Sequence, residues 1–312
     1  TDFGDMLSAR KAVSGAANST RGLIFGGWAY DNTIEYVTIA SPGNSIDFGD
    51  LTNNPEYHGA TGSATTAIVG GGDISPGGRT DTIQKVQFDT PGNATDFGDL
   101  SESKKRITAT SNLSRAVFMG GSGGSSNGYQ VNTIEYVTID TPGNAVDFGD
   151  LLSVNQLGSS TSGVPTSGGG GASVKWYGDR AVNGGGQAQE ATYSSVIEYG
   201  AIATGSSFSD FGDLTVGKIE LDACSSPTYG LFWGGYNAGV KQEIDYITIS
   251  TTGNATDFGD MTHTSYWGGA CSSGTRGCHY GTGSWDGSYN VQNIDYVTIA
   301  TPGNAQDFGD LG

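Results

Sequence analysis

The chain has 312 residues and is strongly acidic, with 32 Asp and Glu residues, 14 Lys and Arg residues and a formal net charge of −18. Proteins that bind nucleic acid or anionic membranes need a basic surface, so this charge argues against both classes of partner. No apolar run reaches about 18 residues and no signal-peptide pattern is visible, so we expect no membrane insertion, and three cysteines are too few for a disulfide-built scaffold.

The tetrapeptide Asp-Phe-Gly-Asp occurs seven times, at intervals of 45 to 63 residues. Its copies begin at Asp2, Asp47, Asp96, Asp147, Asp210, Asp257 and Asp307. Repeats at such a period indicate stacked supersecondary units, each of which covers its neighbour.

The segments between these copies follow one order. A loose Ser, Ala and Thr segment leads to a short apolar run that in five of the six units ends in glycines; the six runs are residues 21–27, 66–72, 115–121, 180–186, 229–235 and 276–282. A variable loop then leads to a strand-like segment, at residues 32–39, 81–88, 132–139, 195–202, 242–249 and 292–299. Each unit therefore predicts four strands, which we call A to D.

The third predicted strand, with the sequence NTIEYVTI at residues 132–139, is apolar on both alternating faces. Ile134 and Tyr136 point to one side, and Val137 and Ile139 to the other, which predicts a strand between two covering layers. The Thr-Pro-Gly-Asn sequence that follows predicts a type II turn between strands C and D.

Six units of four antiparallel strands predict an all-β, six-bladed β-propeller that forms a single domain over residues 1–312. The expected units are residues 6–51, 52–100, 101–151, 152–214, 215–261 and 262–311, with an inserted loop around residues 162–173. Seven Asp-Phe-Gly-Asp copies exceed six blades. Either one copy is spare or the chain is cut from a longer array.

The order of an apolar strand that ends in Gly-Gly, a strand with a Tyr and a fourth strand with an aromatic residue resembles the kelch repeat. Gly120-Gly121, Tyr136 and Phe148 carry the resemblance in the third unit, with Phe in place of the kelch Trp. The second and sixth units depart from it at Lys85 and Thr282. Units that end in PGNATDFGDL also resemble repeat arrays in structural proteins of marine tailed phages of the cyanophage type, which implies a virion protein with no assigned active site.

The Phe of each later copy is expected to fill the core between neighbouring blades; these residues are Phe48, Phe97, Phe148, Phe211, Phe258 and Phe308. The flanking aspartates are expected to accept hydrogen bonds from backbone N–H groups at the outer strand. A kinase-type magnesium site is excluded because its lysine, glycine-rich loop and catalytic loop are missing. A calcium site lacks the spaced acidic ligands that such loops use.

Other residues give weak signals for chemistry. His263, Cys271, Cys278 and His279 gather in the sixth unit, but their spacing is not that of a zinc site. Arginines recur at the start of strand B, where we expect them to bond acidic groups of a neighbouring blade; these are Arg21, Arg115, Arg180 and Arg276. We therefore predict no catalytic residues, no metal site and no cofactor.

The loops between strands B and C differ among units and should emerge on one face of the propeller. They carry Trp28, Tyr30, Asp31, Tyr129, Tyr193, Tyr236, Asn237, Trp285, Asp286 and Tyr289. Exposed aromatic rings beside Asp and Asn suit the binding of sugars or the anchoring of a protein partner. The sequence thus predicts a non-enzymatic structural or binding protein of a tailed-phage virion, in its tail, fibre or shell, whose partners are other virion proteins or host surface glycans. The alternative is a carbohydrate-binding, lectin-like propeller.

Overall fold

The computed structural model describes residues 5–8, 12–41, 43–76, 78–112, 114–124, 129–161, 179–188, 192–266, 268–280 and 293–310. These residues form β-strands, turns and bridges but no helix. Most of the strands belong to six antiparallel sheets of four strands, so the all-β class and the four-stranded antiparallel unit predicted from the sequence are confirmed.

The sheets follow one another along the chain. Sheet 1 consists of β1 (Ser14–Ala17), β2 (Arg21–Phe25), β3 (Thr33–Thr38) and β4 (Ile46–Asp50). Sheet 2 consists of β5 (Gly59–Gly62), β6 (Thr66–Gly70), β9 (Thr82–Gln87) and β10 (Thr95–Asp99). Sheet 3 consists of β12 (Thr108–Ser111), β13 (Arg115–Met119), β16 (Thr133–Thr138) and β17 (Val146–Asp150).

The other three sheets repeat the pattern. Sheet 4 consists of β18 (Ser159–Thr161), β19 (Arg180–Gly184), β22 (Val196–Ala201) and β23 (Ser209–Asp213). Sheet 5 consists of β24 (Asp222–Ser225), β25 (Tyr229–Trp233), β26 (Glu243–Thr248) and β27 (Thr256–Asp260). Sheet 6 consists of β28 (Gly269–Ser272), β29 (Arg276–Tyr280), β30 (Asn293–Thr298) and β31 (Gln306–Asp310).

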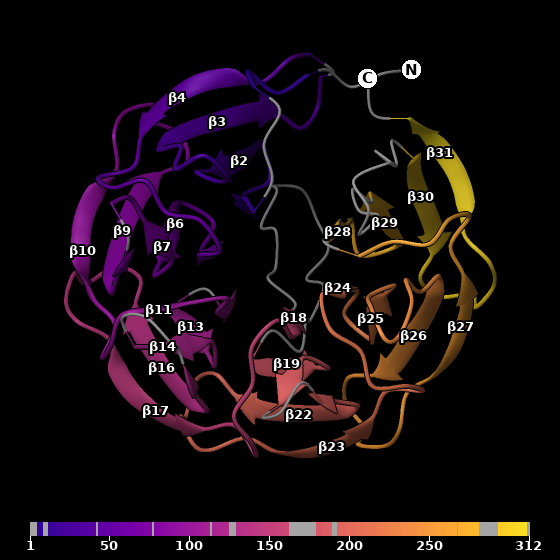
Figure 1. The fold of residues 1–312 in the computed structure, drawn as a ribbon. Coiled ribbons are helices and arrows are strands. Elements are labelled where there is room, and N and C mark those ends of the chain that lie inside the picture. The colour runs from indigo at the N-terminus through magenta and orange to yellow at the C-terminus, as the bar shows by residue number, and fades with distance from the viewer. Residues whose placement is uncertain are drawn as a thin grey trace.

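The six sheets stand around a common axis in a propeller-like arrangement (Figure 1). The first strand of each sheet lies innermost and packs beside the first strand of the next, in the order β1, β5, β12, β18, β24 and β28. β28 and β1, of the last and the first sheet, make no comparably extensive contact. The expected loop insertion at residues 162–173 lies outside the described residues.

Five hydrophobic cores fill the spaces between successive sheets. The third strand contributes to two of them, because Ile134 and Tyr136 face sheet 4 while Val137 and Ile139 face sheet 2. The prediction that this strand is covered on both faces is therefore confirmed. A ring of six sheets closed on itself would need a sixth such core.

The phenylalanines of the repeated tetrapeptide divide into two groups. Phe48, Phe97, Phe148, Phe211 and Phe258 are at most 5% exposed. Phe308 is 53% exposed, so its predicted place in a core between sheets is wrong. The physical reason is that no described sheet packs against the outward face of sheet 6.

The Pro-Gly pair does not form the chain reversal that the sequence predicted. In sheet 3 the N–H of Thr141 donates to the carbonyl of Thr138 at 2.9 Å, so the turn is centred on Ile139 and Asp140, three residues before Pro142 and Gly143. Pro142 and Gly143 follow the turn, and the Gly143 N–H donates to the Phe97 carbonyl of sheet 2 at 2.7 Å. The Pro-Gly-Asn segment thus joins neighbouring sheets instead of shaping the hairpin.

The arginines at the start of the second strand also act differently from the prediction. Arg115 Nη1 donates to the backbone carbonyl of Ile202 in sheet 4 at 2.9 Å, and its guanidinium lies 4.3 Å from the centre of the Tyr136 ring. Arg21 and Arg180 make the same pair of contacts in sheets 1 and 4. Their acceptor is a carbonyl of the next sheet and not an acidic side chain, because the strand edge brings that carbonyl within reach.

Candidate functional site

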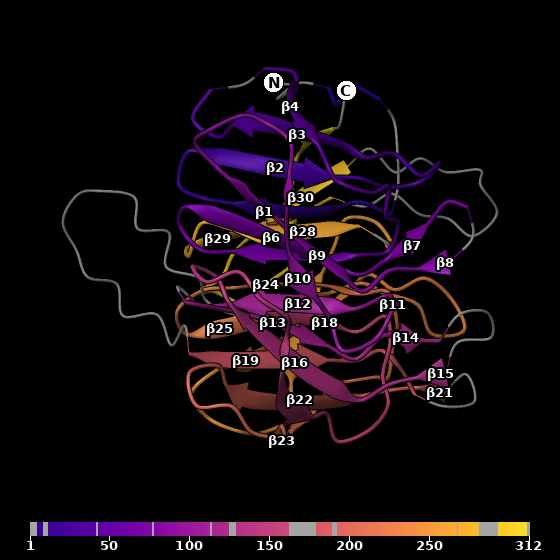
Figure 2. The same ribbon diagram turned by 90° about the vertical axis from the view of Figure 1, so that its left-hand side faces the viewer.

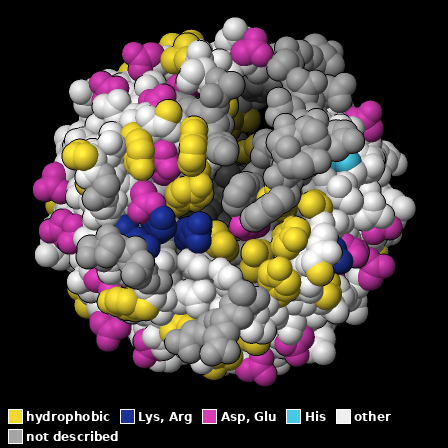
Figure 3. Space-filling model, viewed as in Figure 1, with side chains coloured by type: hydrophobic (Ala, Val, Ile, Leu, Met, Phe, Trp, Pro, Cys, Tyr) yellow, Lys and Arg dark blue, Asp and Glu magenta, His cyan; other side chains and the backbone are white. Residues whose placement is uncertain are grey.

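The loops between the second and third strands lie on one side of the ring of sheets. Short strands extend these loops: β7 (Asp73–Ile74), β8 (Gly78–Arg79), β14 (Ser122–Gly123), β15 (Tyr129–Gln130), β20 (Gln187–Ala188) and β21 (Thr192–Tyr193). A further short strand, β11 (Lys104–Lys105), lies in the connection between sheets 2 and 3 and pairs with β14. Those labelled in Figure 2 project from the same face, at its right-hand side. We call this surface the B–C face; Figures 1 and 3 look onto it.

The predicted aromatic residues have different exposures on this face. Trp28, Tyr30 and Tyr129 are exposed by 51%, 40% and 61%. Tyr193 and Tyr236 are half-buried. Trp285, Asp286 and Tyr289 lie outside the described residues.

The loop of sheet 1 holds its aromatic residues in an unusual backbone conformation. Ala29 and Tyr30 have φ angles of 72° and 57°, which side chains other than glycine seldom adopt. The Asp31 carboxylate accepts the Thr33 N–H at 2.7 Å, and the Glu56 carboxylate accepts the Tyr30 N–H at 3.2 Å. Asp31 therefore helps to shape the loop, and strain of this kind recurs at binding sites.

Sheets 4 and 5 place three tyrosines in a row. The rings of Tyr193 and Tyr236 meet edge to face with centroids 6.0 Å apart, and Tyr236 lies 6.1 Å from Tyr266. The Asn237 side-chain amide donates to the Gly217 carbonyl, which fixes the loop that carries Tyr236. Tyr236 and Asn237 thus pack against neighbouring residues, whereas the side chains of Trp28, Tyr30 and Tyr129 are exposed and available to contact a ligand.

Tyr129 carries an acidic neighbour. Its hydroxyl donates to the Glu102 carboxylate at 2.8 Å, and this hydrogen bond raises the pKa of the Tyr129 phenol because the neutral form holds the donated proton. The pair presents an aromatic face beside a carboxylate, which suits a ligand with hydroxyl or amide donors.

A charged cluster on sheets 2 and 3 was missed by the sequence reasoning. Lys105 and Arg79 both form ion pairs with Asp73, and Arg79 Nη1 also donates to the carbonyl of Gly124 at 2.5 Å. Lys105 and Arg106 lie 5.8 and 5.6 Å from the Tyr57 ring. Burial raises the pKa of the Tyr57 phenol, and the nearby Arg106 guanidinium opposes that shift. Figure 3 shows Lys and Arg side chains grouped with Asp and Glu near the centre of this face.

One residue in each of the first five units lies near the axis on the B–C face, and the corresponding residue of the sixth unit lies outside the described residues. Ala12, Tyr57, Arg106, Leu157 and Glu220 each lie two positions before the innermost strand of a sheet, and each has a φ of 55° to 60°. Backbone hydrogen bonds link some neighbours, with the Arg106 N–H on the Tyr57 carbonyl at 2.8 Å and the Glu220 N–H on the Leu157 carbonyl at 3.1 Å. We call these five residues the axial ring. Its conformation repeats while its side chains differ, which is the pattern of a binding position on a constant frame.

The histidines and cysteines of sheet 6 come together without forming a metal-ligand set. His263 Nδ1 lies 3.4 Å from Asp295, and His279 Nε2 lies 3.1 Å from Asp222. Cys271 and Cys278 face each other across β28 and β29 as free thiols. Among the described residues, no group of three or more His, Cys, Asp or Glu side chains is arranged to hold a metal ion.

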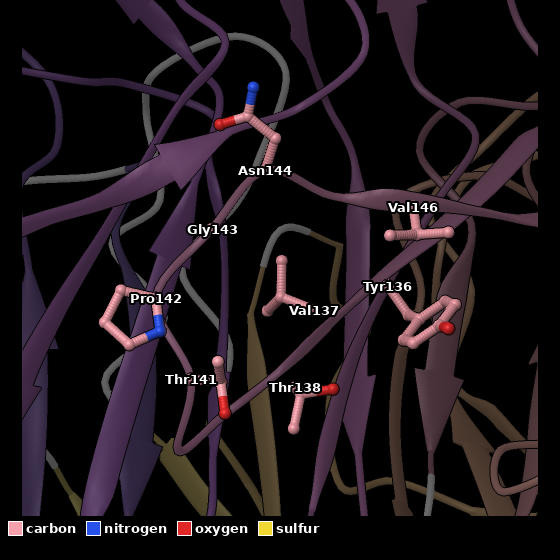
Figure 4. A pocket seen from close by; sticks show the side chains of 8 residues that line it. All are labelled: Tyr136, Val137, Thr138, Thr141, Pro142, Gly143, Asn144 and Val146. Carbon is pink, nitrogen blue, oxygen red and sulfur yellow. The ribbon is translucent and has the colours of Figure 1, made fainter.

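A shallow hollow of about 260 Å³ lies in the hairpin between β16 and β17 (Figure 4). Tyr136, Thr138, Pro142 and Val146 line it, while the Asn144 side chain points away from them. Asn144 is already engaged as the acceptor of the Asp99 N–H at 3.2 Å. The hollow is a by-product of the joint between sheets and offers no convergent polar groups.

No family model matches this chain, and comparison with curated proteins gives no match. Within the part of the chain that the structure describes, no helix is long and apolar enough to span a bilayer.

Proposed function

We propose that the six sheets are the blades of a kelch-like β-propeller and that the protein is a non-enzymatic binding module. The observation that carries this proposal is the B–C face, where Trp28, Tyr30 and Tyr129 expose large aromatic surfaces from loops anchored on packed sheets. Aromatic anchors on a rigid frame bind with little loss of conformational entropy. The mixed side chains of the axial ring extend the same face toward its centre.

The setting that we propose is the virion of a tailed phage, in its tail, fibre or shell. The resemblance of the PGNATDFGDL units to phage structural repeats supports it, as does the acidic surface, which favours solubility of an extracellular particle. The partner would be another virion protein or a host surface glycan that covers the B–C face.

Carbohydrate recognition is the second candidate, and the pairing of Tyr129 with Glu102 favours it. A ring that stacks on a sugar beside a carboxylate that accepts its hydroxyl protons is a common arrangement in sugar-binding sites. The two candidates differ only in what the face contacts.

A binding screen against glycans and host surfaces tests both candidates. The parent is compared with a variant that carries Trp28→Ala, Tyr30→Ala and Tyr129→Ala. The matched control carries Val146→Ala and Leu152→Ala, which remove side chains that are 54% and 52% exposed outside these loops. Binding that is lost in the triple variant and kept in the control supports the B–C face.

Binding that survives in the triple variant would place the site elsewhere. If no glycan binds, co-purification with other virion proteins becomes the readout, with the same two variants. A failure of both readouts would reject the binding module.

A further inference from the structure

Sheet 6 exposes a face that is buried in each of the other five sheets. Cys278, Ile294 and Phe308 lie at positions where sheet 3 has Val117, Ile134 and Phe148, which are at most 5% exposed. In sheet 6 Phe308 is 53% exposed, Cys278 and Ile294 are half-buried, and Tyr280 is 40% exposed. This face is one half of an inter-sheet core of the kind found five times in the molecule.

Sheet 1 exposes the residues that would form the other half of such an inter-sheet core. Ile39 is 46% exposed, whereas its counterparts Phe88, Ile139, Ile202, Ile249 and Ile299 are at most 4% exposed. Val37 and Ile24 are half-buried, although Val137 and Phe118 are at most 3% exposed in sheet 3. In Figure 1 sheet 1 and sheet 6 stand farther apart than the other neighbouring sheets.

Two kinds of contact that join neighbouring sheets elsewhere in the molecule are not found among the described residues at the outward face of sheet 6. Gly98 lies so close to sheet 3 that a Cβ atom would be 2.3 Å from the Gly143 carbonyl oxygen, but a Cβ atom at Gly309 would meet nothing within 4 Å. The Arg115 guanidinium donates to a carbonyl of the next sheet, whereas Arg276, at the same position of sheet 6, is exposed over Tyr296. The outward face of sheet 6 therefore carries the residues that contact the next sheet elsewhere in the molecule, but no described sheet packs against them.

Residues 5–7 make the contacts of a fourth strand with sheet 1. The Asp5 N–H donates to Asn44 Oδ1 at 3.0 Å, and the Ser45 N–H donates to the Asp5 carbonyl at 2.8 Å. The Leu7 N–H donates to the Glu35 carboxylate at 3.0 Å. The fourth strand of sheet 2 makes the same three contacts with sheet 3, through Asp99 with Asn144 and Ala145, and Ser101 with Glu135.

The sequence of this segment agrees with that role. Residues 1–6 read TDFGDM, and so do residues 256–261, which contain the fourth strand of sheet 5. In sheet 5 that hexapeptide follows residues 215–255, which supply the first three strands. Residues 5–7 thus stand where the end of a fourth strand stands in the other sheets, and no described sheet supplies the three strands that would lie beside it.

We propose that the junction between sheet 6 and sheet 1 is a docking site for a three-stranded polypeptide segment of this chain's own repeat type. The segment would lie beside Asp5 and Leu7 and form a further sheet between sheet 6 and sheet 1. Its Gly-Asn pair would contact Gly309 and Phe308, and its strands would cover Ile39. The inference concerns the frame of the molecule and stands apart from the ligand of the B–C face.

Adding such a segment tests the proposal. A second copy of residues 215–255, carrying Cys224→Ser, is fused after Leu311 of the full chain. Cys271 and Cys278 lie on the open face, so their alkylation, mapped by mass spectrometry, reports whether the face is covered. We expect alkylation of both thiols to slow by about tenfold or more and the unfolding temperature to rise. The control fusion has the same residues in scrambled order.

Unchanged alkylation in a folded fusion, or equal protection by the scrambled segment, would overturn the proposal. Two rearrangements of the unfused chain would overturn it as well. If sheet 6 can close directly on sheet 1, deletion of residues 1–8 would protect both thiols from alkylation. If a second copy of the chain covers this face, protection of the thiols would rise with protein concentration.

A second measurement does not depend on the fusion. Phe308→Ser in the 312-residue chain should leave the unfolding temperature almost unchanged, while Phe148→Ser should lower it clearly, because only Phe148 is buried. Equal losses would mean that the face of sheet 6 is already covered, and the docking site would be rejected.

Discussion

The backbone N–H of Asp5 donates to Oδ1 of Asn44 at 3.0 Å, and the same bond joins four pairs of successive sheets. The others run from Asp50 to Asn93, Asp99 to Asn144, Asp213 to Asn254 and Asp260 to Asn304, at 3.0 to 3.2 Å. The tetrapeptide Asp-Phe-Gly-Asp and the Pro-Gly-Asn segment are therefore two halves of one joint. The first aspartate completes it by accepting the glycine N–H, as Asp147 does from Gly149 at 3.1 Å.

Removal of the asparagine acceptor should weaken the joint. We expect Asn93→Ala to lower the free energy of unfolding by about 1 kcal/mol, the usual worth of one hydrogen bond, in urea denaturation. Asn93→Ser should lower the free energy of unfolding by less, because a serine can accept this hydrogen bond. In sheet 4 Ser207 accepts the Asp150 N–H at 3.1 Å. Equal losses for both variants would show that the acceptor oxygen contributes little.

The glycine of the tetrapeptide is needed for close approach as well as for its backbone angle. Gly98 and Gly309 have φ angles of +149° and +140°, so alanine strains both, by about 1–3 kcal/mol. Only at Gly98 would the added Cβ atom collide with the next sheet, 2.3 Å from the Gly143 carbonyl oxygen. We expect Gly98→Ala to lower the free energy of unfolding by about 1–3 kcal/mol more than Gly309→Ala. A similar loss at both positions would mean that the backbone angle alone requires glycine.

The repeat period was enough to predict the strands, their order and the apolar residues between sheets. A strand such as β16 has no polar face, and its alternation places Ile134 and Val137 on opposite sides whatever the neighbours are. The role of Pro-Gly could not be predicted in this way. Local turn preferences favour a reversal there, but bonds to the preceding sheet, such as Gly143 to Phe97, place the reversal earlier.

The exposure of Phe308 shows a second limit of reasoning from repeats. Residues 302–311 differ from residues 142–151 only in Gln306 for Val146, and the neighbouring sheet decides whether Phe308 or Phe148 is buried. The axial ring was missed for a related reason. Tyr57, Arg106 and Glu220 share a backbone angle and a position in the repeat, but they are different residue types. They are found only when the aligned units are compared by backbone conformation instead of residue identity.

Two lysines are fully buried beside acidic residues. Lys104 and Lys218 are 0% exposed and pair with Glu135 and Asp245. Lys104→Met should lower the free energy of unfolding by about 3–5 kcal/mol, because it leaves the Glu135 carboxylate buried without its partner charge. Urea denaturation of the purified variant measures this loss.

Sheet 2 suggests the compensating change. There Gln84 stands in place of Glu135, accepts the Thr52 N–H at 2.6 Å and donates to Asn53 at 2.7 Å, and Pro55 stands in place of the lysine. The double variant Lys104→Met with Glu135→Gln should therefore recover most of the stability, since the introduced amide keeps an acceptor oxygen for the Ser101 N–H. A double variant no more stable than the single one would show that the ion pair itself, not charge neutrality, stabilises the sheet.

The three cysteines should differ strongly in reactivity. A hydrogen bond from Cys271 and the nearby Arg276 guanidinium lower the pKa of Cys278 to about 7, while burial raises the pKa of Cys224 to about 12. The thiolate is the reactive form, so alkylation of Cys278 should rise with pH to half its maximal rate near pH 7, against about 8.5 for an ordinary thiol. Cys271→Ala removes the donor and should move this midpoint upward. Rates for each cysteine, measured by iodoacetamide labelling and peptide mass spectrometry, check the order; a Cys278 midpoint near the ordinary value of about 8.5 in the parent would show that the Cys271 bond does not form in solution.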